Sequence, residues 1–159
     1  CSILFCCDRS RVGRSGSSRE SSRCHTTRLI MKIEVSNGEV LDKYSILLIK
    51  SERITDPTAL KNVQRELESL QPTVDTIHSQ ESSGALITLQ DQLLEVNTQL
   101  WEVEDVIRGL EKSQDFGPSF VATARSVYQL NDRRAAVKKE INLLTGSAMV
   151  EEKSYEKYD

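Results

Sequence analysis

The sequence lacks the features from which a membrane or catalytic function is most readily recognised. It has no apolar run near the ~18 residues that a membrane-spanning helix requires. It also has no Gly-rich phosphate loop, no HExxH pair, no nucleophile elbow and no CxxC pair. We therefore expect no membrane span, no metal and no cofactor. Any site has to be assembled from polar side chains that helices bring together.

Cysteine is missing from most of the chain. All four cysteines lie in the first 30 residues: Cys1, Cys6, Cys7 and Cys24. Residues 31–159 contain none, so their fold cannot depend on disulfides, which suits a reducing compartment. The cysteine pairs lack the CxxC spacing of zinc sites and lie in a segment without periodicity, so we expect no zinc site there.

Acidic residues are scarce in the same first 30 residues. This segment has six Arg, seven Ser and two acidic residues, for a net charge of +4, against −7 for residues 31–159. Such a composition is typical of an organellar transit peptide. Because the chain begins with Cys and a well-patterned segment begins at Met31, untranslated sequence or a truncated gene model explains the segment at least as well. We expect residues 1–30 to be disordered, without a function.

The remainder divides into a helical domain at residues 31–146 and an acidic tail at residues 147–159. Its acidic charge argues against nucleic acid as a partner, because phosphate binding requires clustered Lys and Arg. We expect the protein in the cytoplasm, or in an organelle if the first 30 residues are a transit peptide.

Hydrophobic periodicity predicts an all-α fold, an antiparallel helical bundle preceded by one short strand or extended arm at residues 31–36. Ser36 is the expected N-cap of the first helix, with Glu39 closing a capping box. Asp56 and Pro57 predict the start of a second helix, which should end at Pro72. The polar residues 73–84 should form a flexible connection, in which His78 is solvated.

The strongest pattern is an apolar seam with 3-4-3-4-3-4-3 spacing over a long third helix. Its residues are Leu86, Leu89, Leu93, Val96, Leu100, Val103, Ile107 and Leu110. A turn at residues 115–118 should lead into a fourth helix that ends before Gly146 in a left-handed C-cap. Short turns favour antiparallel neighbours, so the last two helices should form a hairpin. The seam predicts association with a second copy or with a larger protein.

The candidate ligand site consists of polar residues on the last two helices, which the hairpin places at similar distances from its turn. The main candidates are Trp101, Glu104, Asp105, Arg108, Arg125, Tyr128, Asn131 and Lys138, and the secondary candidates are Asp42, Lys43 and Lys50. The cations would hold an anionic small molecule, since the fork of Arg binds phosphate or carboxylate. Glu104 or Asp105 would transfer protons in an enzyme. Solvated charges or structural ion pairs explain the same pattern.

Several motifs, taken in order, resemble a bacterial family of uncharacterised small helical proteins. They are residues 31–39 (MKIEVSNGE), 42–43 (DK), 100–105 (LWEVED) with Arg108, 124–128 (ARSVY), 131–133 (NDR) and 151–155 (EEKSY). The resemblance covers about residues 31–158. Such domains occur alone or attached to glycosyltransferase and tetratricopeptide-repeat proteins, which implies a context in glycan or cell-surface polysaccharide synthesis and no mechanism.

Together, the residues and the resemblance favour a helical binding or accessory module of unknown activity. Two alternatives stay open. One is a small all-helical enzyme acting on an anionic sugar or a phosphorylated metabolite, and the other is a plain coiled-coil scaffold.

Overall fold

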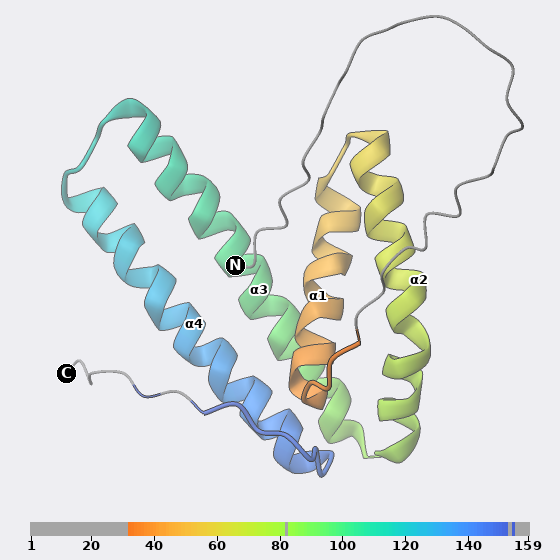
Figure 1. Cartoon of the computed structure of the whole chain (residues 1–159). Coiled ribbons are helices and arrows are strands. Elements are labelled where there is room, and N and C mark those ends of the chain that lie inside the picture. Colours follow the sequence, from red (N-terminus) through yellow and green to blue (C-terminus); the bar gives the residue numbers. More distant parts are fainter. Residues whose placement is uncertain (1–31, 82, 153, 155–159) are drawn as a thin grey trace, which may run out of the picture. The chain divides into compact units, whose positions relative to one another are not determined.

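The computed structural model describes residues 32–81, 83–152 and 154, most of which lie in helices (Figure 1). These residues contain α1 (Asn37–Arg53), α2 (Pro57–Gln80), α3 (Gly84–Ser113) and α4 (Pro118–Leu144). All four belong to one compact unit that begins at Ile33. The predicted all-α bundle is confirmed.

None of the helices in the described residues is long and apolar enough to cross a membrane.

The N-terminal ends of α1 and α2 are set by the predicted capping residues. The Ser36 hydroxyl accepts a hydrogen bond from the Glu39 amide at 3.2 Å. An Asp56 carboxylate oxygen accepts one from the Ala59 amide at 2.7 Å, and α2 begins with proline. Both N-caps are confirmed. The capping box is not completed as predicted, because the Glu39 carboxylate instead accepts a hydrogen bond from Lys138 on α4.

The C-terminal end of α4 is also as predicted. Gly146 has a left-handed backbone with φ of 60°, and the Ser147 amide donates to the Asn142 carbonyl at 2.9 Å. The Gly146 amide donates to the Leu143 carbonyl at 3.4 Å, which completes a Schellman motif. This turn directs the following residues back along α4, where Glu151 and Glu152 pair with lysines of that helix.

Of the two alternatives predicted for residues 31–36, a short strand or an extended arm, the described residues do not form the strand. Residues 32–36 have no regular secondary structure, and Ile33 is 82% exposed. A strand needs a second strand for its backbone hydrogen bonds, and the described residues provide none. The described part of the segment is therefore an arm that leads into the cap of α1. Met31 lies outside the described residues.

The predicted end of the second helix at Pro72 is wrong. Helix α2 continues through Pro72 to Gln80, and Pro72 is exposed. A proline inside a helix costs roughly 3 kcal/mol because it removes a hydrogen bond and crowds the preceding turn. Beyond it, Val74 and Ile77 are only 2% and 3% exposed, and their burial offsets that cost. His78 therefore lies on a helix, where its Nε2 is 2.6 Å from Oε1 of Gln90 on α3.

The core lies where α1 packs against the other three helices. Its buried cluster consists of Val40, Leu41, Val74, Ile77, Leu86, Leu93, Val137 and Ile141. Helices α3 and α4 form the predicted antiparallel hairpin, with Gln114 in a left-handed conformation at the turn. Toward that turn, the two helices lie away from α1 and α2 (Figure 1).

The apolar seam of α3 is divided by this arrangement. Leu86, Leu93 and Val96 are fully buried within the chain, whereas Val103 and Ile107, nearer the turn, are only half-buried. The first half of the seam is therefore covered by the chain's own helices. A partner that used the seam would have to approach the half nearer the turn.

Candidate functional site

A group of charged and polar side chains, with Asp42, Ser45, Asn97 and Lys138 buried among them, lies where α1 meets α3 and α4. We call it the ionic cluster, and its members are Glu39, Asp42, Ser45, Asn97, Arg134, Lys138 and Glu151. Its centre is Asp42, whose side chain is 4% exposed. Oδ1 of Asp42 accepts from Asn97 Nδ2 at 2.9 Å and from Arg134 Nε at 2.8 Å. Oδ2 accepts from Nη2 of Arg134. Three donors thus satisfy this carboxylate.

The local sequence explains how these groups come to be buried. Asp42 follows the fully buried Leu41 on α1, and Asn97 follows the fully buried Val96 on α3. Arg134 interrupts the apolar stripe of α4 before the buried Val137. Each polar residue therefore lies beside a core position, where burial requires a partner. The hydrogen bond to Asp42 raises the pKa of the Arg134 guanidinium above its usual value, against the effect of burial.

Lys138, one turn after Arg134, is paired from two sides. Its side chain is 8% exposed, and Nζ donates to Glu39 of α1 and, at 2.7 Å, to Glu151 of the tail. Burial alone would lower the pKa of Lys138, but the hydrogen bonds to Glu151 and Glu39 outweigh it and raise the pKa above 10.5. The neighbouring Lys139 pairs with Glu152 at 3.0 Å.

The tail is thus attached through its acidic residues. The two tyrosines of the tail, Tyr155 and Tyr158, lie outside the described residues.

The N-terminus of α1 is closed by its own N-cap and by two side chains from the C-terminal end of the domain. Its first three amides donate as follows: Asn37 to Ser147 Oγ at 3.1 Å, Gly38 to Asn142 Oδ1 at 2.6 Å, and Glu39 to Ser36 Oγ at 3.2 Å. These are groups that a helix leaves without intrahelical partners. A Cβ on Gly38 would lie 2.6 Å from the Lys138 carbonyl oxygen, so α1 and α4 are in direct contact here. The ionic cluster and this contact together hold α1 against α4.

Most of the predicted site residues lie elsewhere, on the surface of the hairpin. Arg108 and Glu104 form an exposed pair at 2.6 Å, one turn apart on α3. Asp105 and Arg125 are exposed, and Tyr128 is 40% exposed. Among the described residues, no hydrogen bond or ion pair joins Arg125 to the three charged residues of α3. Their role as a ligand site stays a prediction.

The other predicted residues are divided among several places. Trp101 and Lys50 are half-buried. The Asn131 amide donates to the Val127 carbonyl of its own helix at 2.8 Å. Lys43 forms an exposed ion pair with Glu66 at 3.1 Å. Only Lys138 and the secondary candidate Asp42 enter the ionic cluster. Sequence reasoning did not select Arg134 or Asn97, although an Arg within an apolar stripe is a usable signal.

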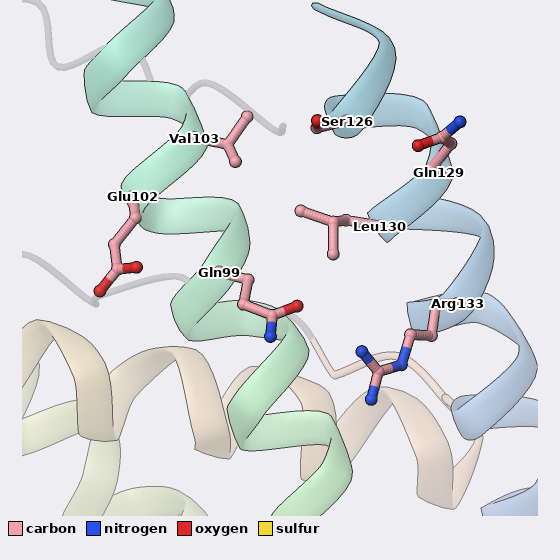
Figure 2. A pocket seen from close by; sticks show the side chains of 7 residues that line it. All are labelled: Gln99, Glu102, Val103, Ser126, Gln129, Leu130 and Arg133. Carbon is pink, nitrogen blue, oxygen red and sulfur yellow. The ribbon is translucent and has the colours of Figure 1, made fainter. Parts of the chain in front are cut away.

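A second location is an open hollow between α3 and α4, with a volume of about 400 Å³ (Figure 2). The residues lining it are Gln99, Glu102 and Val103 of α3 and Ser126, Gln129, Leu130 and Arg133 of α4. Figure 2 shows Leu130 directed toward Val103, and the Arg133 guanidinium directed toward Gln99. The Glu102 carboxylate points away from α4 and pairs with Arg53 of α1 at 3.3 Å.

Glu95, one turn before Gln99 on α3, connects two of the lining residues. Its Oε1 accepts from Gln99 Nε2 at 3.0 Å, and its Oε2 lies 3.6 Å from Nη2 of Arg133. The Arg133 side chain is 48% exposed. Arg133 is therefore held loosely at the hollow. Sequence reasoning missed this place because glutamines and a serine resemble an ordinary solvent-exposed helix face.

The described residues contain no group of three or more His, Cys, Asp or Glu side chains that could hold a metal ion. What the hollow offers is a guanidinium, two amides and a hydroxyl around an apolar base. These groups can bind and orient a ligand.

A family model matches residues 31–158, and its description is a family of unknown function, DUF6165. No curated protein and no solved structure matches the chain significantly.

Proposed function

The chain belongs to this family of unknown function, and we propose that it is a non-catalytic binding module that holds a small ligand in the hollow between α3 and α4. The proposal follows from how the charged groups of the domain are used. It retains the binding or accessory role expected from the sequence and moves the ligand away from the residues expected to bind it.

The observation that carries the proposal is the contrast between two adjacent arginines. Arg134 donates twice to the buried Asp42 carboxylate, so its charge is committed to the fold. Arg133 faces the hollow, and its ion pair with Glu95 is 3.6 Å long, beyond hydrogen-bond distance. A ligand that engaged Arg134 would have to separate a buried pair, which is strongly unfavourable. A ligand that engaged Arg133 would disturb only a surface contact of little energy.

Catalysis is less well supported than binding. General acid–base chemistry needs a proton-transferring group within hydrogen-bond reach of a bound substrate. Asp105 is exposed on the hairpin, and Glu104 is engaged by Arg108. Glu102, the one carboxylate among the described residues that line the hollow, points away from it and pairs with Arg53. This arrangement favours a module that binds its ligand unchanged.

The glycan-building context implied by the resemblance is part of the proposal, although the family's description does not mention it. A module of this kind would present a small metabolite to an enzyme, or sense that metabolite for it. Glutamine amides and a serine hydroxyl suit hydroxyl-bearing ligands of such reactions, because each can both donate and accept hydrogen bonds.

A thermal-shift screen of nucleotide sugars, sugar phosphates and small carboxylates tests the proposed function. A ligand at 100 times its Kd stabilises the folded state by about 2.7 kcal/mol, which raises the melting temperature by several degrees. Ser126→Trp should fill the hollow and abolish the rise. Ser119→Trp, a matched change at an exposed position of the same helix, should leave it intact. A screen without any rise, or a rise that survives Ser126→Trp, contradicts the proposal.

A further inference from the structure

Among the described residues that line the hollow, Arg133 is the one cation directed into it. Figure 2 shows the Arg133 guanidinium pointing toward α3, while the Glu102 carboxylate lies on the side of α3 away from α4. The negative charge of Glu102 is also matched by Arg53 at 3.3 Å. The lining therefore presents a positive group to a ligand and keeps its own carboxylate turned away, which favours an anion.

Arg133 has hydrogen-bonding capacity to spare. A guanidinium carries five N–H donors in a planar fork. Within the part of the chain that the structure describes, Arg133 makes one ion pair, at 3.6 Å to Glu95, and no hydrogen bond. A carboxylate binds such a fork at N···O distances of roughly 2.7–2.9 Å, often through two parallel hydrogen bonds, one to each oxygen. A ligand carboxylate would thus gain contacts that Glu95 does not make.

Besides Arg133, Gln99 and Ser126 each present to the hollow an oxygen that accepts hydrogen bonds. Gln99 uses Nε2 on Glu95 at 3.0 Å, which leaves its amide oxygen, directed toward α4 in Figure 2. The Ser126 hydroxyl donates to the Ala122 carbonyl at 3.1 Å, which leaves its oxygen lone pairs. Both groups call for an N–H or O–H on the ligand. Between them, Val103 and Leu130 offer an apolar base.

From this arrangement we propose that the hollow binds a small molecule carrying a single carboxylate, a neighbouring N–H or O–H donor and a short apolar group. The carboxylate pairs with Arg133, the donor faces Gln99 and Ser126, and the apolar group covers Leu130 and Val103. The inference rests on the proposed function, because it names the ligand class of the same hollow.

Size and charge narrow the class further. A volume of about 400 Å³ lies toward the lower end of the range for small-molecule pockets, which is roughly 300–1,000 Å³. The Glu95 carboxylate already lies 3.6 Å from the Arg133 guanidinium. A carboxylate monoanion would bring the negative charges around this one cation to two, and a phosphate dianion would bring them to three. A carboxylate monoanion therefore fits better than a phosphate.

N-acetyl-leucine is a suitable probe, because it has a carboxylate, an amide N–H and an apolar side chain. Titration into the ¹⁵N-labelled protein should shift the side-chain amide signals of Gln99 and Gln129. The methyl ester of the same probe lacks the charge and should bind at least about tenfold more weakly, because it cannot form charge-assisted hydrogen bonds with Arg133.

Two substitutions test whether the charge of Arg133 binds the carboxylate of the probe. Arg133→Gln should weaken N-acetyl-leucine binding at least about tenfold. The exposed position of Arg133 and its single surface pair mean that the fold should survive, which the backbone amide spectrum verifies. Arg125→Gln removes the same charge from the exposed surface of the same helix and should leave the affinity unchanged.

Equal affinity for the acid and its ester, or unchanged binding by Arg133→Gln, would overturn the ligand class. So would an absence of shifts at Gln99 and Gln129 when the acid is added. The broader proposed function is decided separately by the thermal-shift comparison of Ser126→Trp with Ser119→Trp. The two failures can therefore be distinguished.

Discussion

Removing the Arg134 guanidinium should destabilise the domain far more than removing an exposed arginine. Arg134→Ala leaves the Asp42 carboxylate, whose side chain is 4% exposed, with a single side-chain donor at Asn97. Stranding one member of a buried ion pair costs about 3–5 kcal/mol. Domains of this size unfold in urea with slopes of about 1–3 kcal/mol per molar. The unfolding midpoint should therefore fall by roughly 2 M, measured by far-ultraviolet circular dichroism.

Arg108→Ala is the matched control. Arg108 pairs with Glu104 one turn away, but its side chain is 74% exposed. Such pairs contribute about 0.5 kcal/mol or less, so this midpoint should barely move. Replacing both members of the buried pair, as Asp42→Leu with Arg134→Met, should recover most of the loss, because no charge is then stranded.

Two results would refute this reasoning. The first is a midpoint for Arg134→Ala that falls no further than that of Arg108→Ala. The second is a double variant, Asp42→Leu with Arg134→Met, that is less stable than Arg134→Ala alone. Either would mean that the ionic cluster does not hold α1 against α4.

Three further changes test other contacts by thermal or urea unfolding. Gly38→Ala should destabilise the domain by about 1–3 kcal/mol, because its Cβ would lie 2.6 Å from a carbonyl oxygen of α4. The control Gly109→Ala, where the structure leaves open space around the Cβ, should stabilise the domain by up to about 1 kcal/mol. Equal effects of the two substitutions would contradict the close contact at Gly38. Pro72→Ala should stabilise α2 by about 1–3 kcal/mol by restoring a helical hydrogen bond, and a loss of stability would oppose this. Because the folded-state pKa of Lys138 is raised above 10.5, its pairing stabilises the fold below that pH and is lost as pH rises through the raised value. The stability difference between the wild type and Lys138→Met should thus narrow above about pH 10.5, and a constant difference would contradict the pairing.

The helix boundaries were largely predictable because capping is local chemistry. Ser36, Asp56 and Gly146 each act within a few residues. As expected, α1 begins after Ser36, α2 begins after Asp56, and α4 ends before Gly146. Pro72 was misleading because its local effect competes with contacts to other helices. The burial of Val74 and Ile77 against the rest of the core could not be inferred from the polar residues around them.

The candidate site was less predictable because periodicity identifies a helix face but not which faces meet. Asp42, Asn97 and Arg134 come together only once α1 lies along the hairpin. Their signal was present as polar residues beside core positions. The hollow depends on how far apart α3 and α4 lie near Val103 and Leu130. That distance cannot be inferred from the types of the residues on the two helices.

One measurement tests most directly whether the hollow, rather than the ionic cluster, is the binding site. Side-chain amide signals report on both places. Gln99 and Gln129 line the hollow, whereas Asn97 is buried in the ionic cluster and Asn142 is buried at the neighbouring contact between α1 and α4. When ¹⁵N-labelled protein is titrated with N-acetyl-leucine, the two glutamine signals should shift together while the two asparagine signals stay in place. Shifts of the asparagines with unmoved glutamines would place the ligand in the ionic cluster and contradict the account.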